Sequence, residues 1–159
     1  MIAGLTGHQK IGDELTILWV RDQLAEAVTA WGVTEGCMSL AIGADQMYAE
    51  LLLDRGLPYR VVVPCERYGG TFSDEERQRY FFLLSKAKSV IALGFVKPTE
   101  RAFYEAGKEV VNTSEMLIAI WDGREARGLG GTADIVGFAR ASSKRVLHID
   151  TVGRVVKMI

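Results

Sequence analysis

The stretch GLGGTAD, residues 128–134, combines three glycines with a threonine and a carboxylate. It separates an apolar run that ends at Trp121 from an amphipathic run that begins at Ile135. A glycine-rich turn that enters a helix exposes backbone N–H groups beside the positive end of the helix dipole, where phosphate groups bind. The stretch therefore predicts an anion site, although an ordinary turn that needs glycine for its geometry stays an open alternative. The residues of that site would be Gly130, Gly131, Thr132 and Ala133.

Asp134 adds a negative charge in the first turn of the same predicted helix. This charge would repel a nearby phosphate, so it suits a part of the ligand that carries hydroxyl groups. Two other roles stay open for Asp134. It can stabilise the helix dipole without touching a ligand, or it can act as a catalytic acid, base or nucleophile.

Strand-like and helix-like patterns alternate along the chain. Short continuous apolar runs predict strands, and the runs between them predict helices. Asp45, Thr99 and Thr132 are the expected helix caps, and Ser73 with Glu76 forms a predicted capping box. The predicted strands are 2–6, 39–42, 59–63, 89–93, 116–121, 145–149 and 155–158. The predicted helices are 11–31, 46–55, 73–87, 100–111 and 132–141.

The strands are uniformly apolar rather than alternating, which is typical of strands that are covered on both faces. Strands joined by helices run parallel, with right-handed crossovers. The sequence therefore predicts the α/β class: a three-layer Rossmann-like sandwich with a mainly parallel central sheet of six or seven strands. No linker or repeat interrupts the pattern, so residues 1–159 are predicted to form a single domain.

In such a sheet, ligands bind where the strands end at their carboxyl edge. His8 is placed there to donate to a phosphate, with local bonding as the alternative. Asp45 is either a helix cap or an acceptor for ligand hydroxyls, and Asp122 ends a buried strand at this edge. Residues 67–70 are expected to form a solvated loop, which can also close over the site. The candidate ligand-binding residues at the strand ends are Gly7, His8, Gln9, Gly43, Ala44, Asp45, Asp122 and Gly123.

Composition limits the class of partner. The 19 basic and 20 acidic residues give a formal net charge of −1, so a strong basic field is absent and nucleic acid is an unlikely partner. No apolar run reaches the ~18 residues of a membrane span, and the N-terminus does not resemble a signal peptide, so we expect no membrane partner and a cytoplasmic location. Cys37 and Cys65 form no CxxC pair and should lie at opposite sheet edges, which argues against a zinc site or a disulfide. We predict no cofactor and no metal, and a homo-oligomer stays open.

Five motifs together resemble the SLOG superfamily, which includes LOG-type cytokinin-activating phosphoribohydrolases and the DNA-processing protein DprA. They are TGHQ, IGADQ, VVVP, NTSEMLIAIWDG and GLGGTADIVGFA, in chain order. The resemblance implies a nucleotide or nucleotide-derived ligand at the carboxyl edge of the sheet. Residues 112–122 also resemble nucleoside 2-deoxyribosyltransferases, less closely. By position, the resemblance implies ligand contacts at Gly7, His8, Gly43, Asp45, Gly130, Gly131 and Thr132.

The chain departs from the LOG pattern P-G-G-x-G-T-x-x-E, whose final glutamate serves catalysis. Ile135 stands at the glutamate position and Leu129 at the second glycine, while Asp134 comes one residue early. One residue turns a helical side chain by ~100°, so the catalytic acid is not reproduced. The leading hypothesis is therefore binding of a nucleotide or related phosphorylated ligand. The alternatives are an enzyme that cleaves or transfers an N-glycosidic bond and, less favoured, a signal-sensing or partner-binding module.

Overall fold

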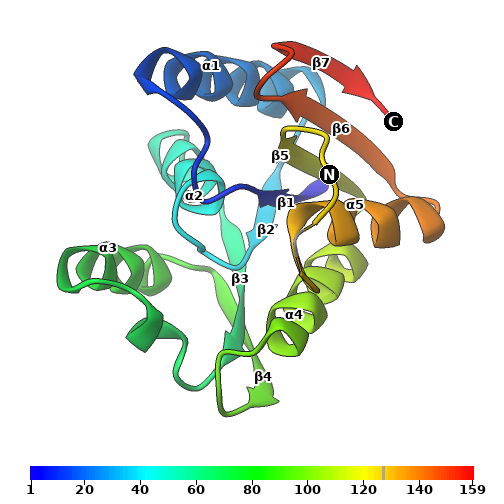
Figure 1. The fold of residues 1–159 in the computed structure, drawn as a ribbon. Coiled ribbons are helices and arrows are strands. Elements are labelled where there is room, and N and C mark those ends of the chain that lie inside the picture. Colours follow the sequence, from blue (N-terminus) through cyan, green and yellow to red (C-terminus); the bar gives the residue numbers. More distant parts are fainter. Residues whose placement is uncertain (127) are drawn as a thin grey trace.

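The computed structural model describes residues 1–126 and 128–159. They form three layers, of which the middle one is a seven-stranded sheet (Figure 1). The strand order is β4-β3-β2-β1-β5-β6-β7. All neighbouring pairs are parallel except β6 and β7, which are antiparallel. The predicted fold class is confirmed. The strands are β1 (Ile2–Gly7), β2 (Glu35–Met38), β3 (Tyr59–Cys65), β4 (Ser89–Phe95), β5 (Met116–Trp121), β6 (Arg145–Asp150) and β7 (Val155–Met158).

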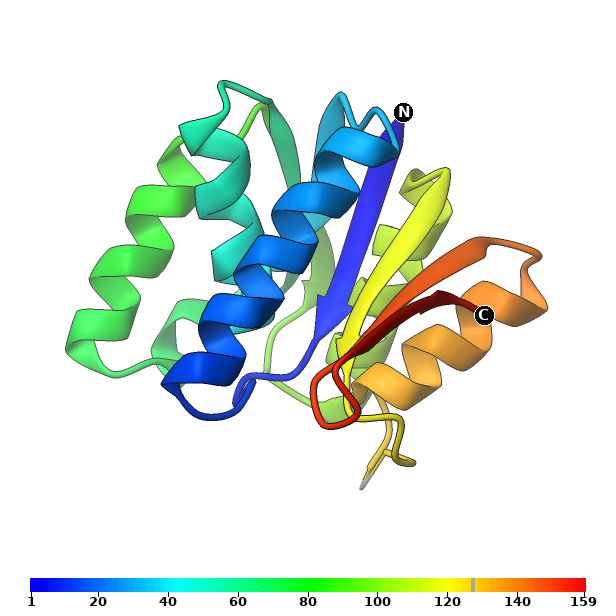
Figure 2. The same cartoon turned by 90° about the horizontal axis from the view of Figure 1, so that it is seen from above.

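Helices cover both faces of the sheet (Figure 2). On one face lie α1 (Glu14–Ala30), α2 (Ala44–Asp54) and α3 (Asp74–Ser85), and on the other lie α4 (Glu100–Thr113) and α5 (Thr132–Ala141). A short 3₁₀ helix, η1 (Tyr68–Thr71), connects β3 to α3. Two of the helices begin beside the centre of the sheet, because α2 packs on β1 and β2 while α5 packs on β5 and β6.

The central strand β5 shows why these apolar runs become buried strands. Successive side chains of a strand point to opposite faces, so each strand supplies two hydrophobic cores. Ile118 and Ile120 join the core beneath α1 and α2, whereas Leu117 and Ala119 join the core beneath α4 and α5. All four side chains are completely buried, which explains the absence of polar alternation in this segment.

Two of the expected helix caps are confirmed and two are wrong. Ser73 and Glu76 form the predicted capping box of α3, and the Thr99 side chain caps α4. However, α2 and α5 begin after Gly43 and Gly131, and neither has a side-chain cap. Asp45 and Thr132 therefore lie inside the first turns of their helices rather than at the cap positions.

The predicted strand over residues 39–42 is wrong. The strand lies just before it, at Glu35–Met38, because buried Glu35 pairs with Arg60 of β3 and accepts a hydrogen bond from Lys88 Nζ at 2.7 Å. In the segment that follows, Leu40 is buried with a φ of 59°, and residues 39, 41 and 42 are half-buried. Cys37 consequently lies within β2, not before its strand. Cys37 and Cys65 are free and buried, so the expectation that they do not pair is confirmed.

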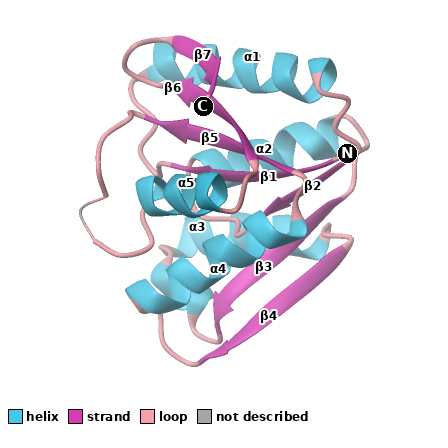
Figure 3. Cartoon of the chain, turned by 90° about the vertical axis from the view of Figure 1, so that its right-hand side faces the viewer, coloured by secondary structure: helices cyan, strands magenta, loops and turns pink. Residues whose placement is uncertain are grey.

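Figure 3 shows the long connection between β5 and α5 projecting from the edge at which β5 ends. Residues 128–131 of the predicted glycine-rich stretch form the last part of this connection, and residues 132–134 form the first turn of α5. Within the described residues, no helix has both the length and the apolar content needed to cross a membrane.

Candidate ligand-binding cleft at the carboxyl edge

A cleft of about 900 Å³ lies at the carboxyl edge of the sheet, a volume in the range of small-molecule sites. Its walls come from the segments that follow β1, β2, β3 and β5, from one side of α4 and from the first turn of α5. Most of the predicted residues line it, and four do not. Those that line it are Gly7, His8, Gln9, Asp45, Asp122, Gly130, Gly131, Thr132 and Ala133. Those outside the lining are Gly43, Ala44, Gly123 and Asp134.

The start of α5 forms one wall of the cleft with its backbone. Among the described residues, the N–H groups of Gly131, Thr132 and Ala133 have no hydrogen-bond acceptor. The first N–H groups of a helix have no partner within the helix, and here no side-chain cap supplies one. This wall therefore presents consecutive unpaired donors at the positive end of a helix dipole.

Glycine is required at Gly130 for the approach to this turn. Its φ is +89°, and a Cβ atom there would lie 2.9 Å from the carbonyl oxygen of Glu100 and from the backbone nitrogen of Tyr104. The glycine-rich stretch thus packs tightly against the first turn of α4. Part of its glycine content has a purely local cause, as the alternative interpretation of the sequence anticipated.

Asp134 has a local partner. Its Oδ2 atom accepts a hydrogen bond from the backbone N–H of Gly130 at 3.0 Å, and its own N–H donates to the carbonyl of Gly131 at 3.1 Å. These bonds close the turn that leads into α5. The structure provides a structural role for Asp134, and the ligand-binding and catalytic roles proposed for it stay predictions.

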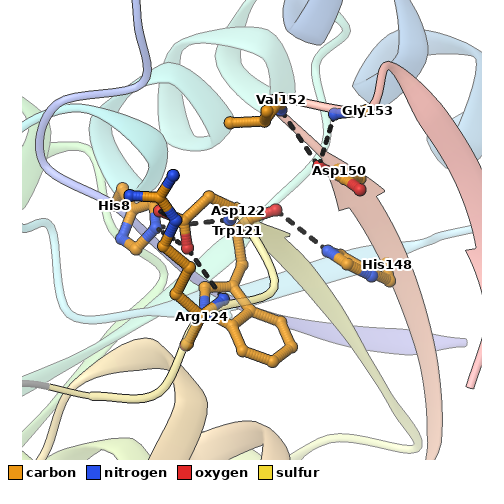
Figure 4. Close-up of polar contacts among 8 residues, drawn as sticks. All are labelled: His8, Trp121, Asp122, Arg124, His148, Asp150, Val152 and Gly153. Carbon is orange, nitrogen blue, oxygen red and sulfur yellow. Dashed lines mark hydrogen bonds and ion pairs between the residues drawn. The ribbon is translucent and has the colours of Figure 1, made fainter.

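His8 and Asp122 meet across the ends of β1 and β5 (Figure 4). His8 Nε2 lies 3.1 Å from Asp122 Oδ1 and 3.3 Å from the backbone nitrogen of Asp122. The other ring nitrogen, Nδ1, has no hydrogen-bond partner among the described residues. His8 is therefore held by local bonds through one nitrogen while the second stays available.

The carboxylate of Asp122 also organises the turn that follows β5. Its Oδ1 accepts the backbone N–H of Arg124 at 3.0 Å, and the Arg124 Nε lies 4.0 Å from Oδ2. Burial opposes ionisation of Asp122, but the Arg124 N–H, the hydrogen bond with His8 and the Arg124 charge together lower its pKa. Asp122 is thus an ionised side chain that fixes both His8 and the turn.

Trp121 and His148 support this turn from behind. Trp121 Nε1 donates to the carbonyl of Arg124 at 2.8 Å, and His148 Nε2 lies 2.9 Å from the carbonyl oxygen of Trp121 (Figure 4). Their rings lie 5.1 Å apart. Gly123 permits the turn, with a φ of +80°. Gly123 therefore shapes the cleft without lining it.

Gly43 and Ala44 also shape the cleft from outside its lining. Gly43 has a φ of +85°, and a Cβ atom there would overlap the carbonyl oxygen of Gln9. The N–H of Ala44 donates to the carbonyl of His8 at 3.2 Å. The start of α2 is thus packed against the loop that carries His8 and Gln9, and this packing holds that loop in place.

Asp45 is the most buried charged group of the cleft lining, with 6% of its surface exposed. Its Oδ2 atom accepts hydrogen bonds from the N–H groups of Ser39 at 3.0 Å and Ala41 at 3.2 Å. Burial raises the pKa of Asp45 to about 7, and these two hydrogen bonds oppose the rise. Instead of capping α2, Asp45 closes the turn after β2 and changes its charge near neutral pH.

An aromatic wall, formed by Tyr68, Phe72 and Phe103, lines the cleft and was not predicted from the sequence. Tyr68 lies 5.1 Å from Phe72 and 6.2 Å from Phe103, measured between ring centroids. The expectation of a solvated loop at residues 67–70 is wrong for Tyr68, which is only 5% exposed because it packs into this cluster. The sequence could have indicated this wall only by position, because Tyr68 and Phe72 follow β3 and Phe103 lies in the first turn of α4.

Charged side chains at the rim complete the cleft. Lys10 and Arg124 supply positive charge, and Glu125 supplies negative charge. Among the residues that the structure describes, no three His, Cys, Asp or Glu side chains are grouped to hold a metal ion. The chemistry available in the cleft is therefore that of backbone donors, one histidine, carboxylates and an aromatic surface.

The chain has the same fold as several proteins of solved structure. DNA processing protein A (DprA) from Streptococcus pneumoniae matches with a TM-score of 0.66 and 12% identity, over 92% of this chain and 49% of that one. DprA from Helicobacter pylori matches with a TM-score of 0.66 and 14% identity, over 93% and 64%. The molybdenum cofactor binding protein from Rippkaea orientalis matches with a TM-score of 0.61 and 16% identity, over 92% and 74%. No protein-family model and no curated protein match the sequence.

These neighbours confirm the predicted fold, and DprA is one of the proteins that the motif resemblance named. The chain spans about half the length of the S. pneumoniae protein and under two thirds of the H. pylori protein. They also correct the expectation that nucleic acid is an unlikely partner, since the H. pylori protein binds single-stranded DNA.

Proposed function

We propose that the protein binds a nucleotide or nucleotide-derived phosphorylated ligand in this cleft, with the phosphate at the start of α5. The observation that carries the proposal is the set of N–H groups at Gly131, Thr132 and Ala133, which line the cleft and have no acceptor among the described residues. Oxygen atoms of a phosphate are suitable acceptors for such donors, and the helix dipole favours their charge. Binding would pair donors that otherwise depend on water.

The surroundings of these donors favour a phosphorylated organic ligand over a free anion. Lys10 and Arg124 add positive charge at the rim, while the aromatic wall continues the cleft with apolar surface. A volume of about 900 Å³ greatly exceeds what a phosphate ion fills. Known molybdenum cofactor and single-stranded DNA binders with this fold are compatible with a ligand of this class, although their low identity assigns no ligand here.

A second candidate function is cleavage or transfer at an N-glycosidic bond. The observation that favours it is Asp45, a carboxyl in the cleft whose pKa burial raises to about 7. A general acid works best when its pKa lies near the working pH. The catalytic reading of Asp134 lacks such an environment, because its carboxylate is bonded to Gly130 in its own turn.

Calorimetric titration tests the binding proposal. The probes are the four common nucleoside 5′-monophosphates, inorganic phosphate and a short single-stranded oligonucleotide, each followed by an assay for released base. Saturable binding of a monophosphate or of the oligonucleotide supports the proposal, and released base adds the enzyme function. A wild-type protein that binds none of the probes contradicts the proposal and favours a partner-binding module.

A pair of variants at Thr132 locates the phosphate. Thr132→Pro removes one backbone N–H but suits the first position of a helix, and Gly131 before it has φ −70° and ψ 169°, which a following proline accepts. Thr132→Ala removes the hydroxyl and keeps the N–H. Loss of one hydrogen bond to a charged group should weaken monophosphate binding by roughly ten- to a hundredfold in the proline variant. Equal affinities in the two variants would place the phosphate elsewhere.

A further inference from the structure

The other end of the cleft holds a carboxylate oxygen without a protein partner. Asp45 Oδ2 takes both backbone hydrogen bonds, and Oδ1 takes none from the described residues. No side-chain nitrogen or oxygen in the described structure is both fully buried and unpaired, so Oδ1 reaches open space. The open space that Asp45 lines is the cleft, which makes this side chain, more than nine-tenths buried, an acceptor exposed only toward a ligand.

The hydroxyl of Tyr68 is a second unpaired group at the same end. It forms no hydrogen bond with the described residues, and by the same reasoning it reaches the cleft. Burial raises the pKa of Tyr68 well above 10, and the charge of nearby Asp45 raises it further. A neutral hydroxyl donor and a carboxylate acceptor therefore line the same cleft, beside the aromatic wall of Tyr68, Phe72 and Phe103.

We propose that this end of the cleft recognises a planar heterocycle that presents a hydrogen-bond donor next to an acceptor, with Asp45 Oδ1 accepting and the Tyr68 hydroxyl donating. The proposal rests on the proposed function. It concerns the part of the ligand other than the phosphate, which the start of α5 would bind. An apolar surface carrying a few convergent polar groups is the usual composition of a site that orients a ring. A nucleobase edge has this chemistry, whereas a sugar phosphate has no planar ring.

The spacing of the two ends suits such a ligand. Asp45 follows β2 and Thr132 follows β5, and only β1 lies between those strands. Neighbouring strands are about 4.8 Å apart, so the ends of β2 and β5 are roughly 10 Å apart. Asp45 and Thr132 themselves lie beyond these strand ends, in α2 and α5 on opposite faces of the sheet, so a ligand that contacts both must be larger than a phosphate alone.

The experiment compares ribose 5-phosphate with the best-binding nucleoside 5′-monophosphate, because the two differ only by the base. We expect the monophosphate to bind the wild-type protein roughly tenfold tighter or more, the effect of one hydrogen bond to a charged group with ring contacts added. In Asp45→Asn, an NH₂ group replaces the free acceptor while the amide oxygen still accepts from Ser39 and Ala41. The preference for the monophosphate should then fall below about threefold, with the affinity for ribose 5-phosphate unchanged.

Two further variants separate recognition from structural damage. Tyr68→Phe keeps the ring and removes only the hydroxyl, so it should reduce the preference by roughly two- to fivefold. Asp54→Asn is the matched control, because Asp54 lies at the far end of the same helix, is exposed and pairs with Arg21 at 3.5 Å. The Asp54→Asn protein should bind both probes like the wild type. Melting temperatures of all variants show that each is folded.

The outcomes for the two proposals differ. Wild-type protein that binds neither of these probes nor the single-stranded oligonucleotide contradicts the proposed function and this inference together. Wild-type protein that binds both probes equally, with no effect of Asp45→Asn, leaves the phosphate site intact and overturns the inference. Loss of both probes in folded Asp45→Asn also overturns it, because Asp45 would then support the whole cleft rather than recognise the ring.

Discussion

Two helices begin at the same sheet edge with closely similar sequences, yet they offer opposite chemistry to the cleft. The first, α2, starts as Gly43-Ala44-Asp45, and α5 starts as Gly131-Thr132-Ala133-Asp134. Both have a glycine at the cap position, no side-chain cap and an aspartate in the first turn. The start of α5 presents unpaired N–H donors, whereas the start of α2 presents an unpaired carboxylate oxygen.

The difference arises from the partners that the backbone supplies. At α2, the N–H groups of Ala44 and Gln46 are taken by the carbonyls of His8 and Ala41, which leaves fewer donors for an anion than at α5. Asp45 is the second residue of its helix and bonds the turn after β2 through one oxygen. Asp134 is the third residue of its helix and bonds Gly130, outside the cleft lining. A glycine and an aspartate at a helix start therefore do not define a site until their neighbours are known.

The largest effect should come from exchanging the two cap glycines for alanine. Gly43→Ala should destabilise the protein by roughly 4 kcal/mol, because its φ of +85° strains an alanine and the new Cβ overlaps the carbonyl oxygen of Gln9. Gly131→Ala should cost about 1 kcal/mol, since its φ of −70° suits alanine and only Ala126, 2.9 Å from the new Cβ, must shift. Urea unfolding measures both values. Equal losses would show that the two helix starts are equally constrained.

The next effect concerns pH and Asp45. The pKa of this carboxyl is 3.8 in an unfolded chain and about 7 in the folded protein, chiefly because of burial. Between these values the folded state binds more protons, so the contribution of Asp45 to stability falls as pH rises from about 4 to about 7. From pH 5 to pH 8 the loss amounts to about 2–3 kcal/mol.

Asp45→Asn removes this titration and should stabilise the protein at pH 8 by more than at pH 5. Urea unfolding of the wild type and the variant at both values of pH gives the comparison, with Asp54→Asn as the control that leaves the pH dependence in place. A variant that is destabilised equally at the two values would mean that Asp45 carries the same charge at both.

The smallest effect should come from Asp134→Asn. The asparagine oxygen can still accept the N–H of Gly130, so the cost is the lost charge at the helix start, about 0.3–1 kcal/mol of stability. The affinity for a nucleoside monophosphate should not fall, because a repelling charge is removed. Melting temperature and calorimetry test this. A marked loss of affinity would restore the ligand-binding role of Asp134, and a loss of base release alone would restore the catalytic role.

The sequence predicts the order of elements well, because continuous apolar runs such as Met116–Trp121 have few alternatives to a buried strand. The sequence-based assignment is wrong at β2, because a charged residue such as Glu35 is rarely buried within a strand. Only the ion pairs with Arg60 and Lys88, from other strands or loops, make that burial possible. A local sequence pattern carries no information about such long-range partners. The strand was therefore assigned to the neighbouring apolar residues 39–42.

The cleft was predictable in position and only partly in composition. Residues directly after β1 and β5 line it as the parallel-sheet argument suggests, including His8 and Asp122. The aromatic wall was missed because Tyr68, which follows β3, meets Phe103 of α4 only after the chain has folded. The free oxygen of Asp45 could not be predicted from the sequence either. It depends on the backbone N–H groups of Ser39 and Ala41, which both bond the other carboxylate oxygen.

Amide NMR shifts test the central claim most directly, because the N–H groups of Gly131, Thr132 and Ala133 are themselves the proposed phosphate ligands. Inorganic phosphate should shift these amides with little change at Ser39 and Ala41. A nucleoside monophosphate that binds should shift the same amides and extend the changes to Ser39 and Ala41, which bond Asp45. A bound monophosphate that leaves Gly131, Thr132 and Ala133 unshifted while it perturbs other cleft residues would contradict the account.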